Sequence, residues 1–387
     1  MTDPASAAPD TPPEPPTQSP APAPDSSAPS PAPSASSKAP TERGWGRLLV
    51  ALAAFIFVPM IPQIRALLPI EETMVLFVPA VAACALVGWW AGGRAFLAIA
   101  WVAIAVLLTV QSTAMAATPD GGAFYNLSRG WSLLLAGAFG LVCLFAEERP
   151  MFPRALVALG ITLVLAGVMS MLGPVTLSHA AGTVAQEYAR RNAETMATIN
   201  GVIQSHQKEW QDLASKVPRL NQLPAETQKE LGLISQFGYA VFPALLALES
   251  LAALALAWAT YHRLGRARLG APLRPLREFR FNDQLVWGLI VGLTVLLLPT
   301  LTTLRGAGKN LLMFFGALYA MRGFGVLSWF MAPGSLGITL GVGFIMLFAP
   351  VLNAVAALVF MLLGVAALAL GLGDTWADWR RRARPSP

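Results

Sequence analysis

The sequence of 387 residues is poor in charge, in histidine and in cysteine. Only 12% of its residues are charged and 55% are hydrophobic, whereas about 25% of the residues in a typical soluble domain are charged. Such a composition, with apolar runs of roughly 20 residues, predicts a helical membrane protein. The three histidines are scattered, and Cys84 and Cys143 lie in apolar runs without a neighbouring thiol. We therefore expect neither a metal site nor a disulfide framework.

The chain also lacks the motifs that carry common enzyme chemistry. It contains no G-x-S-x-G, no H-E-x-x-H and no paired carboxylates. The run RGAGKN over 305–310 lacks the first glycine of a phosphate-binding loop and has Asn310 where that loop needs a hydroxyl. We expect no enzyme, no cofactor and no metal. A lipid-modifying enzyme is a third hypothesis, but it has no acid–base or metal constellation to support it.

The apolar runs predict an all-α fold, a polytopic transmembrane helix bundle of about ten spans. The basic excess, 27 Lys and Arg against 21 Asp and Glu, lies in short loops, which is typical of membrane topology and not of nucleic-acid binding. The bilayer is thus the expected partner, and nucleic acid is not. The expected spans are 48–64, 73–91, 95–116, 131–146, 155–177, 238–262, 284–303, 310–331, 335–350 and 352–373.

The distribution of basic residues predicts that both termini are cytoplasmic. The ninth span is short and ends at Pro350, so it is either a Gly-rich crossing or a re-entrant hairpin; the crossing keeps the basic C-terminal end inside. The expected parts are a disordered Pro/Ala/Ser-rich tail (1–44), five helices (45–177), an extracytoplasmic helical insert (178–237), five more helices (238–379) and a basic cytoplasmic tail (380–387).

The insert contains apolar residues at heptad spacing, followed by Pro218. This pattern predicts one helix over about three heptads. The helix either packs on the bundle or a neighbouring helix, or offers a docking face to an extracytoplasmic partner. The seam residues are Met196, Ile199, Ile203, His206, Trp210, Leu213 and Val217.

Two ionisable residues are expected inside the membrane, where a charge needs a partner or a water-lined cavity. Glu249 and Arg322 both lie roughly 16–18 Å from the outer ends of their expected spans. We hypothesise that they pair or share a cavity, either as a binding site or as a structural ion pair. Tyr319 and Asn310 complete this candidate site for a ligand or ion pair.

The C-terminal third contains four distinctive runs: FRFNDQLVW at 279–287, KNLL at 309–312, YAMRG at 319–323 and LALGLGD at 368–374. With these runs the chain resembles, over about 279–382, the YybS-like family of bacterial multi-pass membrane proteins, a domain of unknown function. The resemblance implies a protein of the bacterial cytoplasmic (inner) membrane without known enzymatic activity, distantly similar to the membrane substrate-binding subunits of energy-coupling factor vitamin transporters. Its motif residues here are Phe281, Asp283, Gly323 and Asp374.

Two functions remain open at this stage. The first is a solute-binding or transport-associated membrane subunit, whose partner would be a small solute. The alternative is a structural or assembly protein that docks a membrane or extracytoplasmic protein through its external helix and proline-rich tail.

Overall fold

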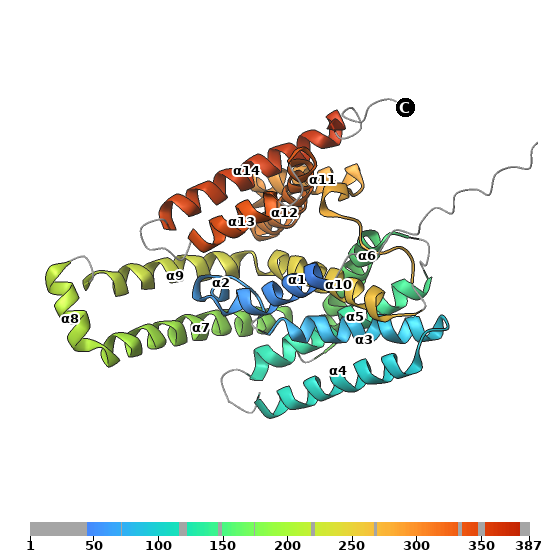
Figure 1. The fold of residues 1–387 in the computed structure, drawn as a ribbon, viewed down its shortest axis with the longest axis horizontal. Coiled ribbons are helices and arrows are strands. Elements are labelled where there is room, and N and C mark those ends of the chain that lie inside the picture. The colour runs from blue at the N-terminus through green and yellow to red at the C-terminus, as the bar shows by residue number, and fades with distance from the viewer. Residues whose placement is uncertain are drawn as a thin grey trace, which may run out of the picture. The chain divides into compact units, whose positions relative to one another are not determined.

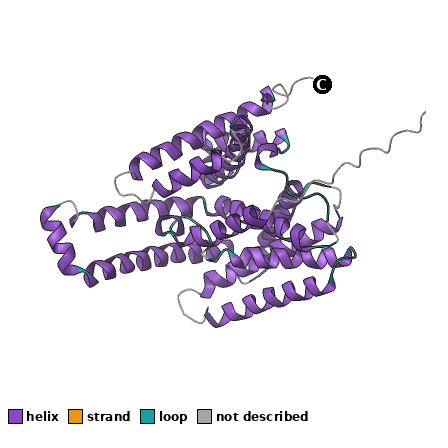
Figure 2. Cartoon of the chain, viewed as in Figure 1, coloured by secondary structure: helices purple, strands orange, loops and turns teal. Residues whose placement is uncertain are grey.

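The computed structural model describes residues 45–70, 72–115, 122–145, 149–173, 175–217, 221–266, 269–331, 335–346 and 353–379. All regular elements in these ranges are helical, and they contain no strand (Figure 2). The expected tails, 1–44 and 380–387, lie outside them.

The helices follow one another along the chain as shown in Figure 1. They are α1 (Trp45–Phe57), η1 (Val58–Met60), α2 (Pro62–Arg65), α3 (Met74–Trp90), α4 (Ala95–Met115), α5 (Gly122–Phe145), α6 (Met151–Leu172), α7 (Leu177–Ser205), α8 (Gln207–Lys216), α9 (Leu223–Ala240), α10 (Phe242–Leu264), η3 (Leu276–Glu278), η4 (Asp283–Leu285), α11 (Val286–Leu297), η5 (Pro299–Leu304), α12 (Arg305–Phe330), α13 (Ser335–Met346) and α14 (Asn353–Ala377).

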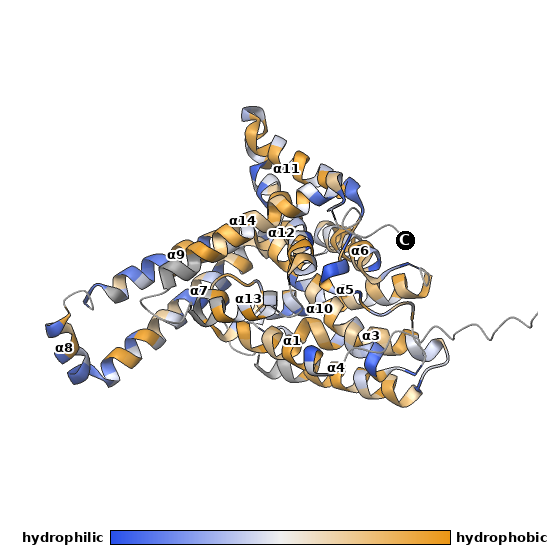
Figure 3. Cartoon of the chain, turned by 45° about the horizontal axis from the view of Figure 1, so that its top comes forward, coloured by the Kyte–Doolittle hydropathy of each residue, from blue (hydrophilic) through white to orange (hydrophobic). Residues whose placement is uncertain are grey.

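Several of these helices have the length and apolar composition that a membrane crossing requires. Five described segments are long enough: α5, α6, α10, η5 with α12, and the part of α14 from Leu358 to Ala377. Four shorter apolar segments are also present, among them Trp45–Met60 and Met74–Trp90. The hydropathy colouring separates these apolar helices from the more polar α7, α8 and α9 (Figure 3). The helical class is confirmed, whereas the number of about ten spans stays a prediction.

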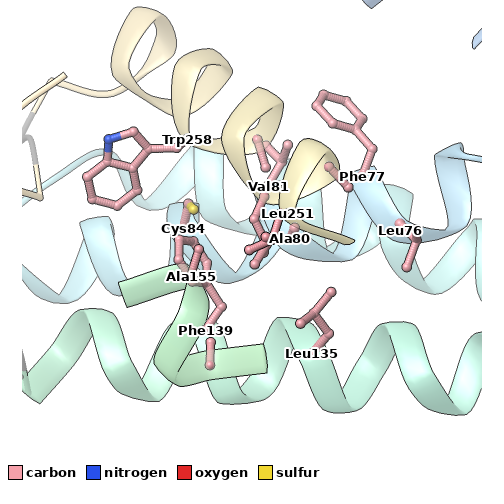
Figure 4. Packing of buried hydrophobic residues seen from close by; sticks show 14 of the residues in the cluster. Leu76, Phe77, Ala80, Val81, Cys84, Leu135, Phe139, Ala155, Leu251 and Trp258 are labelled. Carbon is pink, nitrogen blue, oxygen red and sulfur yellow. The ribbon is translucent and has the colours of Figure 1, made fainter. Parts of the chain in front are cut away.

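The hydrophobic core is built mainly from α3, α5, α6 and α10. Trp258 of α10 is fully buried and packs edge-on against Phe139 of α5, with ring centroids 6.1 Å apart. Cys84 lies in the same core, close to Ala155 of α6 (Figure 4). Cys143 is also buried. This packing fixes four helices against one another and thereby positions the polar residues at their ends.

The fourth expected span, 131–146, starts too late. The helix α5 begins at Gly122 and includes the polar run from Tyr125 to Arg129. Of these residues, Ser128 and Arg129 are buried. A polar side chain that faces the protein interior does not stop a membrane helix, because neighbouring helices supply its environment.

The seventh expected span, 284–303, is interrupted. The helix α11 ends at Leu297, Leu298 is extended (φ −76°, ψ 118°), and η5 begins at Pro299. Proline has no N–H to continue the helix and disfavours helical geometry in the residue before it. Of the ninth expected span, 335–350, the described part Ser335–Met346 is helical, and 347–350 lie outside the described residues.

The insert forms a hairpin in which α7 and α9 run side by side and α8 lies across the far end (Figure 1). The expected single helix was wrong, because the chain turns at His206 (φ −115°, ψ 31°). There the Ser205 hydroxyl donates to the Val202 carbonyl at 2.9 Å, and the His206 ring lies 3.2 Å from the same carbonyl. The seam is half-buried at Met196, Ile199 and Ile203 and exposed at Leu213 and Val217.

Candidate functional site

The helix α7 holds the loop between α2 and α3. Three consecutive carbonyls of this loop accept hydrogen bonds from α7 side chains: Leu67 from the Tyr188 hydroxyl at 3.0 Å, Leu68 from the Arg191 guanidinium at 2.8 Å and Pro69 from the same guanidinium at 3.5 Å. Buried carbonyls need such partners. The side chains of α7 therefore hold this part of the loop in a fixed position.

Arg191 itself is balanced by a carboxylate one turn away. Glu187 accepts from the Arg191 Nε at 2.7 Å, and both side chains are almost completely buried. Arg190 donates to Glu187 at 2.7 Å and also pairs with Glu194, which accepts from Arg65 at 3.2 Å. Burial raises the pKa of Glu187, but the hydrogen bonds and charges of Arg190 and Arg191 outweigh it and bring the pKa below the ordinary 4.5.

Glu249 of α10 lies beneath this loop. Its side chain is 6% exposed, and neither carboxylate oxygen has a hydrogen-bond partner in the described structure. The backbone amide of Ile70 and the guanidinium of Arg191 are close enough to act on this carboxylate. The next residue, Ser250, accepts a hydrogen bond from the Trp131 indole at 2.9 Å. We call Glu249, with Glu187, Tyr188, Arg191 and the loop residues 66–70, the outer cluster.

The outer cluster combines one satisfied ion pair with one unsatisfied carboxylate. Removing a carboxylate from water without a compensating hydrogen bond costs several kcal/mol. Ionisable side chains persist in membrane helices mostly where a solute, ion or proton uses them. Glu249 is thus the group in this cluster that is available to bind something else.

Arg322 of α12 belongs to a second group of charges. Its Nε donates to Asp374 of α14 at 3.0 Å, its Nη2 to the Asp374 carbonyl at 3.2 Å and its Nη1 to Asp283 at 2.5 Å. Arg280 extends the network by pairing with Asp378. We call Arg322, Asp283, Asp374, Arg280 and Asp378 the arginine cluster.

The hypothesis that Glu249 pairs with Arg322 is wrong. The helix α10 begins at Phe242 and not at 238, and α12 begins at Arg305 and not at 310. Glu249 therefore lies about 10 Å from the start of α10, whereas Arg322 lies about 25 Å from the start of α12. The two helix starts are adjacent, because Asn310 accepts from the Ala244 amide at 2.9 Å. The depths differ by about two to three helical turns, and the carboxylates on Arg322 are Asp374 and Asp283.

Tyr319 and Asn310, the other two residues of the expected site, lie on α12 but contact different parts of the protein. Tyr319 is fully buried beside the arginine cluster and packs edge-on against Phe281 at 5.0 Å. Asn310 donates to the Ala240 carbonyl at 3.2 Å and so bridges the break at Val241 between α9 and α10. Both contacts are with the protein's own groups.

The four family-motif residues converge on Arg322. Asp283 and Asp374 hold its guanidinium, and the Phe281 ring lies 5.6 Å from its Cζ. Gly323 lets α12 approach α14, because a Cβ there would overlap the Ala367 backbone. The residues that carry the family resemblance therefore connect α12 with α14 and with the segment before α11.

Sequence reasoning missed the partners of both groups. Glu187 and Arg191 have the i,i+4 spacing of a helical ion pair, which was a usable signal. Asp374 lies in the last turn of α14. An acidic residue at the end of a membrane helix is usually interpreted as a residue of the membrane–water interface, so the sequence did not indicate that it is buried. Arg129 lies just before the expected span 131–146 and was therefore interpreted only as a loop charge, whereas α5 begins at Gly122 and includes it. Among the described residues, no group of three or more His, Cys, Asp or Glu could hold a metal ion.

Long apolar helices and buried intramembrane charges define an α-helical membrane protein. The chain matches the family described as "Predicted membrane protein (DUF2232)" over residues 161–368, more than half of its length, and it belongs to that family. The match extends from α6 into α14 and includes Arg322. No curated protein and no solved structure matches the chain.

Proposed function

We propose that the protein is a solute-binding or transport-associated membrane subunit without enzymatic activity, of the YybS-like kind, in the bacterial cytoplasmic membrane. The observation that carries the proposal is Glu249, a buried carboxylate in a membrane-length helix with neither oxygen hydrogen-bonded in the described structure. A positively charged group of a solute satisfies this carboxylate, since charge pairing is strong in a dry interior. The loop residues 66–70, held by α7, cover the site.

The proposed topology places α7–α9 outside and both termini in the cytoplasm. It is supported by the last turn of α10, which carries Arg263, and by the segment after it, which carries Arg274, Arg277 and Arg280, whereas the α7–α9 hairpin lies at the other end of α10. Basic residues favour the cytoplasmic side. With this topology the outer cluster receives its solute from outside the cell.

Native mass spectrometry of the protein extracted in a mild detergent tests the binding function. We expect the wild type to retain a small molecule, the Glu249→Gln variant to lose it, and the Glu230→Gln variant to keep it. Glu230 is exposed on α9 and serves as a matched control for the removal of one carboxylate. Equal ligand occupancy in the wild type and the Glu249→Gln variant would contradict the proposal.

The alternative, an assembly protein, is favoured by one observation on the hairpin. Val202, Leu213 and Leu233 are each more than half exposed and are side chains that a docked protein would cover. The triple variant Val202→Gln, Leu213→Gln, Leu233→Gln leaves the contacts of α7 with the loop intact. Loss of a co-purifying protein in this variant, with no small ligand in the wild type, would favour the assembly function.

A further inference from the structure

A second buried charge, that of Arg129, lines a pocket between α3, α4 and α5. The lining of this small, partly open pocket includes Val75, Pro79, Leu108, Arg129 and Leu133. The lining is apolar except for a few groups, which is the usual composition of a ligand site. Arg129 supplies its charge.

The pocket lies where a proline interrupts the hydrogen bonds of α3. Pro79 has no N–H to donate to the Val75 carbonyl one turn earlier. The Ser132 hydroxyl of α5 donates to that carbonyl instead, as neighbouring helices do for freed backbone groups in membranes. On α4, the Thr109 hydroxyl donates to the Ala105 carbonyl of its own helix at 2.7 Å. Both hydroxyl hydrogens therefore have acceptors, and the guanidinium is the donor left over.

Arg129 is 7% exposed, and its Nε and Nη2 atoms are buried without a hydrogen-bond partner in the described structure. Its Cζ lies 4.6 Å from the ring centre of Tyr125, whose hydroxyl donates to Glu72 at 2.6 Å. The aromatic face holds the guanidinium in place but accepts no conventional hydrogen bond from its edge. A fork of two adjacent N–H donors is suited to an oxyanion with two oxygens.

The surroundings of the pocket indicate what carries that oxyanion. Leu133, which lines the pocket, is half exposed, and on the faces of α4 turned away from the pocket Val106, Leu107 and Val110 are more than half exposed. In a bilayer such side chains contact acyl chains. An anion that arrives at this pocket from the lipid brings an apolar chain for the apolar lining.

We propose that this pocket binds the phosphodiester headgroup of an anionic phospholipid, with Arg129 as the binding residue and the acyl chain leaving past Leu133. The site is independent of Glu249 and of the proposed transport function. The phosphate satisfies the Nε and Nη2 atoms of Arg129. The lipid also fills the space beside Pro79.

Native mass spectrometry in detergent tests the proposal, with phosphatidylglycerol as the probe. Diacylglycerol with the same chains removes the phosphate from the probe, and inorganic phosphate removes the chains. We expect one tightly bound phosphatidylglycerol in the wild type and at least about tenfold weaker binding in the Arg129→Gln variant, because a charge-assisted hydrogen bond is lost. The Arg94→Gln variant, which removes an exposed arginine between α3 and α4, should bind as the wild type does.

A second pair of variants keeps the guanidinium and blocks its access. The Leu133→Trp variant narrows the mouth of the pocket and should weaken phosphatidylglycerol binding, whereas Leu141→Trp, at an exposed position further along α5, should not. This pair decides the question if Arg129→Gln fails to fold. Unchanged lipid binding in both Arg129→Gln and Leu133→Trp would overturn the proposal. Inorganic phosphate or diacylglycerol that bound as tightly as the phospholipid would overturn it too.

Discussion

Arg322 and Asp374 show how this protein accommodates a charge inside its helices. Their side chains are 3% and 0% exposed and meet at 3.0 Å, and Asp283 supplies a second, partly exposed carboxylate. A buried ion pair adds little net stability, because desolvation offsets most of the attraction, but the loss of one partner leaves an uncompensated charge. The role of this pair is therefore to make the contact between α12 and α14 specific.

Replacing Arg322 alone should be much more damaging than replacing the pair. We expect Arg322→Met to destabilise the protein by about 3–5 kcal/mol, because Asp374 stays buried without its partner, and the double variant Arg322→Met, Asp374→Leu to recover most of this loss. The measurement is the free energy of unfolding by SDS titration in mixed micelles. Arg277→Gln, whose side chain is 57% exposed, is the control and should cost under about 1 kcal/mol. A double variant no more stable than Arg322→Met would refute this account.

The residues of these clusters were only partly predictable from the sequence. A charge in a long apolar run identified Glu249 and Arg322 correctly as buried groups of long apolar helices. Their partners could not be assigned, because the start of a membrane helix is uncertain by several residues wherever polar residues such as those before Arg129 face the interior. The start of α10 was placed four residues too early and the start of α12 five residues too late. These two shifts made Glu249 and Arg322 look equally deep, although their depths differ by about two to three helical turns.

At the scale of the helix, close approach between α12 and α14 depends on glycine. A Cβ at Gly323 would overlap the Ala367 carbonyl, and a Cβ at Gly371 would overlap the Tyr319 carbonyl. Small residues of this kind allow helix backbones to touch in membranes, where packing and not the hydrophobic effect drives association. The same contact brings Asp374 within reach of Arg322.

Alanine at these glycines should force the two helices apart. We expect Gly323→Ala and Gly371→Ala each to destabilise by about 1–3 kcal/mol, since an added methyl in a tight contact cannot be absorbed. Gly316 on α12 and Gly364 on α14 have nothing within 4 Å of an added Cβ, so Gly316→Ala and Gly364→Ala are matched controls. The SDS unfolding assay measures all four. Equal effects at contact and control positions would show that the backbones do not meet here.

The attachment of α7 depends on Glu187 and hence on pH. The pKa of Glu187 is lowered in the folded protein, so its contribution is complete above the ordinary carboxyl pKa of 4.5 and is lost as the pH falls through the lower folded value. We expect amide protection of 183–195, measured by hydrogen exchange and corrected for the intrinsic pH effect, to fall in that acidic range. Glu187→Gln should reduce protection at pH 7 and flatten the pH profile. Glu209→Gln, exposed on α8, should leave the wild-type profile unchanged.

The elements were predictable to the extent that their apolar runs were uninterrupted. The run of α10 predicted a helix correctly apart from its first residues, whereas the break at Leu298 follows from Pro299, a signal that was present and was not used. The turn at His206 had no comparable signal. Heptad spacing describes only which face is apolar, and it continues across a turn that the Ser205 and His206 side chains stabilise locally.

For the whole molecule, the hairpin α7–α9 and the segment 265–283 should face opposite sides of the membrane. Single cysteines report this directly, because Cys84 and Cys143 are buried and should not react in the folded protein. Lys208 and Glu278 are exposed positions, one on α8 and one on η3. A membrane-impermeant maleimide applied to spheroplasts should label Lys208→Cys at once and Glu278→Cys only after permeabilisation. The wild type, labelled only after denaturation, is the control. Labelling of Glu278→Cys in intact spheroplasts would show that the protein has the opposite orientation in the membrane. The outer cluster would then open to the cytoplasm, and Glu249 would receive its solute from inside the cell.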